Sequence, residues 1–299
     1  MKVLNFGSLN LDYVYQVEHF VAPGETLSAA SQQVNCGGKG LNQSIALARA
    51  GAKVFHAGCL GRGGEMLKEM LTINGVDTAY LKAVDEIQGN AVIQVNAAAE
   101  NCILLFGGSN QCITQEQITE TMQHFEAGDC LVLQNEVNGI KNIVEQAYNC
   151  EMKVVLNPSP YDERLMCVDF SKLTWLIVNE VEAEQISGSK DPDEFWRIMH
   201  GRYPALSVVI TLGSEGSVCY TGDEKIRQSA YHVKAVDTTA AGDTFTGYFI
   251  AGIMEGLSVK QCMERATAAS AISVTRAGAA SSIPKRAEVE QYQEVDLES

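Results

Sequence analysis

Short apolar runs alternate with helical segments from about residue 50 onward, and this alternation limits the possible folds more than any other feature. Helical spacing follows each of the runs KVFHAG, CLVLQ and TWLIVN, while KVVLN and SVVITLG have the composition of further strands. CLVLQNE and SVVITLG are apolar at consecutive positions, as in parallel strands covered on both faces. Helical segments rich in Ala and Gly, at about 240–256 and 258–275, end the pattern. The sequence therefore predicts an α/β fold with helices on both faces of a mostly parallel sheet.

Four short segments with strand character interrupt this rhythm. They lie at about 11–17, 28–35, 90–96 and 102–106. Ala99-Glu100-Asn101 is predicted to be a hairpin turn between the last two. We interpret the four strands as a lid over the edge of the large sheet, where an active site must exclude water. No linker or internal repeat is present, so residues 1–299 are predicted to form a single domain that carries this lid.

The acidic composition limits the partners. Against 37 Asp and Glu there are 22 Lys and Arg, a formal charge of −15, so we expect no nucleic-acid partner and no anionic membrane partner. Phosphate groups would have to be bound locally, for example by N–H groups at a helix N-terminus. No stretch approaches 18 uninterrupted apolar residues, and a soluble, cytoplasmic protein is expected. The nine cysteines form no C-x-x-C pair and the five histidines no zinc-type spacing, so reduced, mostly buried thiols and no zinc site are expected.

The string DTTAAGDTF at 237–245 carries the most specific chemical information. We place it between a strand, YHVKAV at 231–236, and a long helix. A carboxylate at Asp243 would accept the proton of an attacking hydroxyl. Taken alone, Asp243 would more often be a helix cap, but the whole string is much harder to explain in that way. Four successive N–H groups would form a concavity for a transferring phosphoryl group, those of Ala240, Ala241, Gly242 and Asp243.

A second glycine-rich turn, NCGGKGLNQ at 35–43, also lies between a predicted strand and a helix. Its three glycines would bring the backbone close to a ligand. Lys39 and Asn42 would then hydrogen-bond several hydroxyl groups. A helix entry with a solvated lysine is about equally consistent with GGKG alone, and the segment lacks the frame of a Walker A loop.

Further polar residues lie at predicted strand ends, where ligands bind in open parallel sheets. Asn10 and Asp12 are two residues apart, so they share one face of a strand and suit a polyol. Glu136 follows LVLQN, and Asn179 and Glu182 follow WLIV. Read in isolation, the first pair fits a solvated turn equally well, and Glu182 fits the exposed face of a helix.

Signals for other enzyme classes are weaker. The glycines after residue 57 lack the G-x-G-x-x-G order of a nicotinamide-binding turn. No G-x-S-x-G, no protein-kinase motif and no hydrolase triad is present. Cys36 has no histidine close in sequence and is interpreted as a packing residue.

Together these segments resemble the ribokinase (PfkB) family of sugar kinases over nearly the whole chain. NCGGKGLNQS resembles its N-terminal signature and DTTAAGDTFTGYFIAGI its C-terminal signature, with GSLNLD, APGET, QNE, LNPSP, VNEVEAE and ITLGSEG in the expected order. The resemblance implies a Rossmann-like sheet with a small β lid that often forms a dimer contact, and hence a homodimer. It also implies ATP, Mg²⁺ and K⁺ as cofactors.

The resemblance also assigns residues by position. The sugar would be bound by Asn10, Asp12, Gly38, Lys39, Asn42, Glu136 and Asp243. Catalysis would involve Asp243 as the base, with Gly242, Ala241 and Ala240 around the anion. The nucleotide would contact Asn179, Thr211, Gly213, Gly216, Gly242 and Thr267. Mg²⁺ would be held near Glu182 through water. The monovalent cation would be held, partly by backbone carbonyls, at Asp237, Thr239, Ser273, Arg276, Gly278 and Ser282.

Two positions depart from the family pattern. Ala240 replaces a glycine found in many relatives, but its methyl group leaves the N–H intact, so we expect little loss. Thr267 replaces a histidine often found near the adenine.

D-Ribose is the expected substrate, because Lys39 with Asn42 and the Asn10–Asp12 pair resemble ribokinases most. Another pentose, a hexose or a nucleoside is the alternative, with specificity set at lid residues such as Ile93, Asn101 and Leu104. A catalytically silent sugar or nucleotide sensor is the alternative from a different class.

Overall fold

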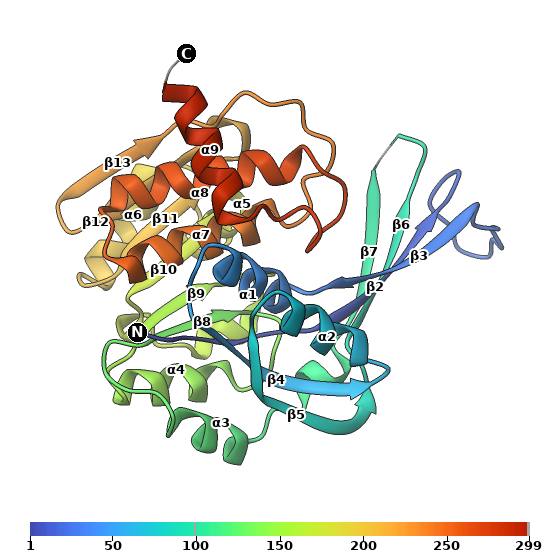
Figure 1. Cartoon of the computed structure of the whole chain (residues 1–299), viewed down its shortest axis with the longest axis horizontal. Helices are drawn as coiled ribbons and strands as arrows, with labels where there is room; N and C mark the ends of the chain where they lie inside the picture. Colours follow the sequence, from blue (N-terminus) through green and yellow to red (C-terminus); the bar gives the residue numbers. More distant parts are fainter. Residues whose placement is uncertain (99, 298–299) are drawn as a thin grey trace.

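The computed structural model describes residues 1–98 and 100–297 and contains a large sheet and a small one (Figure 1). The large sheet has nine strands in the order β13-β12-β11-β10-β9-β8-β1-β4-β5. Its parallel strands are β11 (Ser207–Thr211), β10 (Trp175–Asn179), β9 (Lys153–Asn157), β8 (Cys130–Gln134), β1 (Val3–Phe6), β4 (Val54–Arg62) and β5 (Asp77–Ile87). One edge continues antiparallel through β12 (Ser217–Thr221) and β13 (Glu224–Gln228). The predicted mostly parallel sheet is confirmed.

Helices cover both faces of the large sheet, as predicted. The first layer contains α1 (Lys39–Arg49), α2 (Glu65–Ile73), α7 (Ala241–Glu255), α8 (Val259–Val274) and α9 (Arg286–Leu297). The second layer contains α3 (Gln115–Met122), α4 (Ile140–Asn149), α5 (Glu180–Ser187) and α6 (Pro192–Arg202). Short 3₁₀ turns occur at Gly108–Gln111, Glu163–Cys167, Phe170–Lys172 and Gly213–Glu215.

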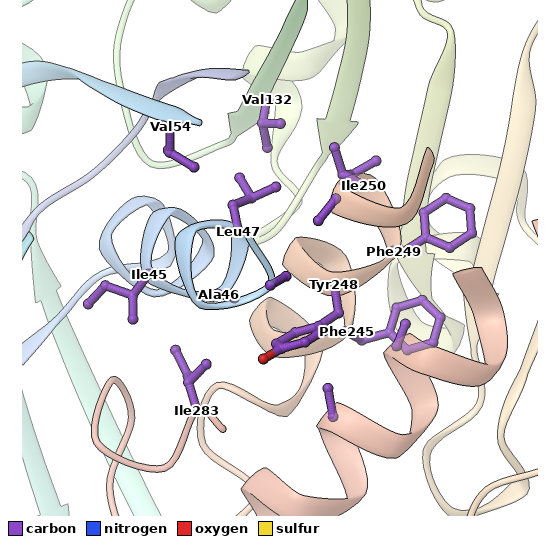
Figure 2. Close-up of a cluster of buried hydrophobic side chains, with 14 of the residues drawn as sticks. Ile45, Ala46, Leu47, Val54, Val132, Phe245, Tyr248, Phe249, Ile250 and Ile283 are labelled. Atoms are coloured by element: carbon purple, nitrogen blue, oxygen red, sulfur yellow. The ribbon is translucent and has the colours of Figure 1, made fainter. Parts of the chain in front are cut away.

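The two layers explain why the strands are apolar at consecutive positions. Val132 of β8 packs into the core beneath α1 and α7, where Figure 2 shows it near Leu47 and Ile250. Its neighbours Leu131 and Leu133 point to the other face and join the core with α3 and α4. Because side chains alternate along a strand, each strand needs apolar residues of both parities to bury both faces.

The four strands predicted outside the main rhythm form the small sheet, which projects from the edge of the large one (Figure 1). Its strands are β3 (Ser31–Gly37), β2 (Asn10–Gln16), β6 (Asn90–Val95) and β7 (Asn101–Phe106), in that order. β2 and β6 are parallel and the outer pairs are antiparallel. β3 starts three residues later than predicted. Ala99, in the predicted hairpin turn, lies outside the described residues.

Two sequence predictions about the C-terminal part are wrong. Residues 231–236 form no strand, because β13 already occupies that edge of the sheet and Val236 instead donates its N–H to the Val274 carbonyl at the end of α8 (2.7 Å). A third helix, α9, follows the two that were predicted to end the chain.

The nine cysteines are all free thiols, as predicted. Five of them are buried, whereas Cys102 and Cys167 are exposed. Among the described helices, none combines the length and the apolar composition that a membrane span would need.

Candidate active site

The site begins where α1 crosses α7. A Cβ atom added at Gly247 would lie 2.4 Å from the Cβ of Ala46, so the two helices touch through their smallest residues. Figure 2 shows α1, with Ala46 labelled, beside α7. Asn42 and Asp243 each lie one helical turn before this contact. The close crossing therefore brings the start of α1 and the start of α7 together.

The Asp243 carboxylate is held by two amides from α1. Asn42 Nδ2 donates to Oδ2 (3.0 Å) and Gln43 Nε2 donates to Oδ1 (2.9 Å). Asp243 is only 5% exposed, and each of its oxygens receives one of these N–H groups. Hydrogen bonds to the ionised form of a buried carboxylate stabilise that form and fix its direction.

The turn before α7 leaves N–H groups open. Ala241 N–H donates to the Thr238 carbonyl (3.2 Å). The N–H groups of Ala240, Gly242 and Asp243 have no acceptor within the described part of the chain. Because these N–H groups stand at a helix N-terminus, they favour an anion at that position.

Ala240, the cap of α7, adopts the left-handed conformation with φ 61° and ψ 9°. The left-handed conformation costs an alanine about 1–2 kcal/mol relative to the right-handed one, a cost that glycine avoids. The sequence shows that alanine stands at position 240, where many relatives have glycine. It does not show the backbone strain, because that depends on the φ angle of Ala240.

Glu136 and Lys39 form the next part of the site. Glu136 Oε2 accepts the backbone N–H of Lys39 (3.0 Å) and a short hydrogen bond from the Ser8 hydroxyl. Burial raises the pKa of Glu136, and Lys39 opposes this effect. Burial lowers the pKa of Lys39, but the carboxylates of Asp243, Glu136 and Glu182 outweigh it and the net pKa is raised. Lys39 is therefore a protonated cation among three acids. Ser8 was missed by sequence reasoning, since one serine in a turn carries no signal.

Asn10 and Asp12 both lie on β2, as predicted for residues on one strand face. The side-chain oxygen Oδ1 of Asn10 accepts from Asn110 Nδ2 (2.7 Å). The Asp12 carboxyl accepts no hydrogen bond within the described residues. Burial, together with the charge of Glu136, raises the pKa of Asp12 to about 7. Asp12 is thus a partly buried acceptor without a protein donor, as a ligand-binding carboxylate would be.

The glycines of NCGGKG allow close packing within the protein and do not only make room for a ligand. A Cβ atom at Gly37 would lie 1.9 Å from Asp12 Oδ2, and one at Gly40 would lie 2.3 Å from the backbone nitrogen of Ser8. The two glycines therefore let the turn pack onto β2 and the loop before it. Gly38 caps α1 at φ 95°, a conformation that favours glycine.

A small pocket of about 60 Å³ adjoins the Asp243 carboxylate. Asn179 and Glu182 line it and form a capping box at the start of α5: Asn179 Oδ1 accepts the Glu182 N–H (2.8 Å), and Glu182 Oε2 accepts the Asn179 N–H (3.1 Å). Glu182 Oε1 accepts no hydrogen bond within the described residues. One carboxylate oxygen of Glu182 thus supports the helix, and the other is open to a ligand.

A larger pocket of about 360 Å³ lies on the other side of the α7 start, and Thr211 and Gly242 line both pockets. The larger pocket also brings together Gly213, Gly216 and Thr267, which the sequence grouped as nucleotide contacts. The Thr267 hydroxyl is buried and has no hydrogen-bond partner in the part of the chain that the structure describes. Sequence reasoning missed the apolar lining, which includes Tyr231, Val233, Phe245, Ala271 and Val274. The residues near 231 were missed because they were interpreted as a strand.

The residues expected around a monovalent cation lie in two loops, which Asp237 joins, and at the end of α8, where Ser273 lies. Asp237 Oδ1 accepts the N–H (2.9 Å) and the hydroxyl (2.7 Å) of Thr239, and Oδ2 accepts the N–H of Gly278 (2.9 Å). Burial acts to raise the pKa of Asp237, but these hydrogen bonds outweigh it and lower the pKa, so the group stays ionised.

The other residues expected at this cation site have partners of their own. Ser273 donates to the Ser270 carbonyl (2.8 Å) and Ser282 to the Ala279 carbonyl (2.8 Å). The Arg276 guanidinium pairs with Glu288. Across the described residues, no three His, Cys, Asp or Glu side chains form a metal-binding cluster. A cation in this region would depend on backbone carbonyls and water as well as on Asp237.

Comparison with known proteins agrees with this geometry. The model of the family described as "pfkB family carbohydrate kinase" matches residues 1–286. The chain is 37% identical to a ribokinase of Haemophilus influenzae over 96% of this chain and 97% of that protein. It is 30% identical to a deoxyribokinase of Salmonella typhi, over 98% of each chain. A solved Arabidopsis thaliana ribokinase complexed with ribose and ATP superposes with a TM-score of 0.86 and 27% identity, over 97% of this chain and 98% of that one. The chain therefore belongs to the pfkB family of carbohydrate kinases.

Proposed function

We propose that this protein transfers the γ-phosphoryl group of ATP to D-ribose and so makes D-ribose 5-phosphate. The observation that carries the proposal is the Asp243 carboxylate, held by two amides beside open N–H groups at the start of α7. A base and an anion-binding turn then stand next to each other, as phosphoryl transfer to a hydroxyl requires.

The reaction breaks the bond between the γ-phosphorus and the β–γ bridging oxygen of ATP. The sugar hydroxyl oxygen forms the new bond to phosphorus, its proton passes to Asp243, and ADP leaves with the electron pair of the broken bond. The N–H groups at Gly242 and in the turn around it stabilise the charge on the transferring group. The sugar binds to Asn10, Asp12, Gly38, Lys39, Asn42 and Glu136.

ATP occupies the larger pocket in this proposal. Its apolar lining suits a purine base, and the unpartnered Thr267 hydroxyl offers one polar contact to that base. The phosphates extend past Thr211 and Gly242, which line both pockets, toward Asp243 in the smaller one.

Mg²⁺ and K⁺ fit the donors that are present. The free oxygen of Glu182 and the oxygens of Asn157 and Asn179 surround the small pocket and suit a hydrated Mg²⁺, which would neutralise phosphate charge. The ionised Asp237, tied to Thr239 and Gly278, suits a K⁺ ion that would stabilise the turn before α7.

The small sheet acts as the lid of this site and as the contact of a homodimer. β7 exposes a row of apolar side chains, and Leu104 is 71% exposed. A patch of this kind on a soluble protein indicates an interaction surface. We place the enzyme in the cytoplasm as one domain with this lid, because sugar phosphates and ATP are cytoplasmic metabolites and the chain carries nine free thiols.

A coupled assay of ADP release tests the proposal. D-Ribose should give the highest kcat/KM among pentoses, hexoses, nucleosides and 2-deoxy-D-ribose, and the release should require ATP and Mg²⁺. Asp243→Asn should lower kcat by about 100-fold or more, because the base is lost while ATP binding is kept.

Each other outcome of the assay has a definite meaning. A clear preference for a hexose or a nucleoside would reject ribose as the substrate. Tight sugar and ATP binding in calorimetry with no ADP formed would identify a silent sensor instead. An Asp243→Asn variant with full activity would remove Asp243 from the mechanism.

A further inference from the structure

Gln43 is completely buried behind the Asp243 carboxylate, and its amide is fully hydrogen-bonded. Nε2 donates to Asp243 Oδ1 (2.9 Å) and to Asn157 Oδ1 (3.0 Å), and Oε1 accepts from Gln134 Nε2 (2.7 Å). Asn157 is fixed as an acceptor because its own Nδ2 donates to the Ile177 carbonyl (2.9 Å). The direction of the Gln43 amide is therefore determined by its neighbours.

A buried chain of hydrogen bonds supports Gln43 from the interior of the sheet. Gln134 Nε2 also donates to Asn5 Oδ1 (3.1 Å), and Asn5 Nδ2 donates to the Ser44 hydroxyl (2.8 Å). Ser44 then donates to His56 Nδ1 (2.8 Å), which leaves the Nε2–H of His56 for the Gly7 carbonyl (3.2 Å). Burial lowers the pKa of His56 to about 4, so this end of the chain is neutral.

We infer that Gln43 is a positioning residue for phosphoryl transfer, which holds the Asp243 carboxylate in place beside the small pocket. Gln134 and Asn157 in turn hold Gln43. The inference rests on the proposed role of Asp243 as the base. Breaking one of these buried hydrogen bonds would leave a polar group unpaired, so the bonds favour one arrangement of the side chains. Among the described residues, Gln134 Oε1 is the member of this chain of amides that has no partner.

The charges around Asp243 make the two amides important. The Lys39 ammonium on α1 attracts the Asp243 carboxylate, whereas the Glu136 carboxylate after β8 repels it. The hydrogen bonds from Asn42 and Gln43 add to the effect of Lys39. A carboxylate in place of the Gln43 amide would act in the opposite direction.

Two substitutions of Gln43 separate positioning from simple packing. Gln43→Met keeps the volume but removes the donors, and it should lower kcat about 10- to 100-fold, since a misplaced catalytic group has this effect. The KM values for D-ribose and ATP should change less than about 3-fold, because Gln43 acts on the base and not on bound substrate. Gln43→Glu is nearly isosteric and places a like charge beside Asp243, so the acidic limb of the kcat–pH profile should move up by about 1 unit or more.

Gln117 provides the matched control. It is a buried glutamine on α3, in the opposite helix layer, and its Nε2 donates to the Gly58 carbonyl (2.8 Å). Gln117→Met should leave kcat and the pH profile as in the unmodified enzyme. Circular dichroism and thermal melting establish that each variant is folded. If Gln43→Met does not fold, the pH profile of Gln43→Glu is the deciding measurement.

A double variant tests whether Gln43 acts through Asp243. If it does, Gln43→Met in the Asp243→Asn background should lower kcat less than about 3-fold further, because the two residues act as one unit. The inference is overturned if Gln43→Met keeps kcat, if it costs as much in the Asp243→Asn background as alone, or if Gln43→Glu leaves the pH profile in place. Full activity of Asp243→Asn alone would instead reject the proposed base.

Discussion

At the scale of single residues, Asp12 combines burial with the lack of any hydrogen-bond donor among the described residues. Its pKa is raised to about 7, first by burial and then by the charge of Glu136. Because the folded-state pKa lies above the ordinary value of 3.8, the folded protein binds the proton more tightly than the unfolded chain. Asp12 therefore lowers stability progressively between about pH 4 and pH 7, and only a ligand that donates hydrogen bonds compensates for its ionisation.

D-Ribose affinity should consequently depend on the ionisation of Asp12. Between pH 5.5 and 7 the affinity should increase with pH, by at most about 10-fold per unit, and it should level off above pH 7.5, because the carboxylate accepts the sugar hydroxyls better than the neutral acid does. Calorimetric titration at several pH values measures this. Asp12→Asn, which cannot ionise, should bind more weakly and with a flatter pH dependence. An equally steep dependence in Asp12→Asn would assign the effect to another group.

At the scale of elements, the contact between α1 and α7 sets the geometry of the site. Gly247 has no room for a side chain, because an added Cβ would lie 2.4 Å from Ala46 Cβ and 2.8 Å from the Leu47 nitrogen. Asn42, Gln43 and Asp243 lie one turn before this contact, so a change in the helix spacing would separate the proposed base Asp243 from its amides.

Gly247→Ala should therefore destabilise the protein by about 1–3 kcal/mol and lower kcat as well. Denaturant unfolding and the ADP assay measure the two effects. Ala46→Gly, added to this variant, should recover part of both losses because it removes the clashing methyl group. Gly201→Ala on α6 is the control: apart from the backbone of its own helix and its chain neighbours, no described atom lies within 4 Å of the added methyl, so stability should stay equal or rise by up to about 1 kcal/mol. Unchanged kcat in Gly247→Ala would contradict the link between spacing and catalysis.

The sequence was sufficient to predict the helices and strands that hydrophobic periodicity defines. It was not sufficient to predict those segments whose conformation depends on tertiary contacts. The strands near 131 and 209 and the helix starting near 241 were found because their apolar patterns are strong. The segment at 231–236 has a strand-like composition, yet it binds the end of α8 and lines the larger pocket. Asp243 and Asn42 were found through local motifs, whereas the full set of Gln43 partners was not, because Gln134 and Asn157 come from distant strands.

At the scale of the whole molecule, the exposed apolar side chains of β7 are the surface on which the proposed homodimer would form. Ile103 is 56% exposed and Phe106 is 50% exposed, on opposite faces of the strand. β7 is an edge strand of the small sheet, and its apolar side chains are exposed. A second copy of the chain would bury these side chains by association of the two small sheets.

Leu104→Glu should therefore convert a dimer into a monomer, because it places a charge within an apolar contact. Analytical ultracentrifugation at micromolar concentration measures the mass. Met166→Glu is the control, since Met166 is 78% exposed in the 3₁₀ turn at Glu163–Cys167, away from the small sheet. A monomeric unmodified protein, or a Leu104→Glu variant that stays dimeric, would reject the small sheet as the dimer contact.

The pairing of α1 with α7 joins residues about 200 positions apart, as the 201-residue separation of Asn42 and Asp243 shows. During synthesis, α1 leaves the ribosome early, and α7, on which it packs, is synthesised much later. Its apolar side is meanwhile available to chaperones and proteases. The proposed base Asp243 and its two amides meet only after α7 has been synthesised, so a shorter polypeptide would lack this part of the proposed site.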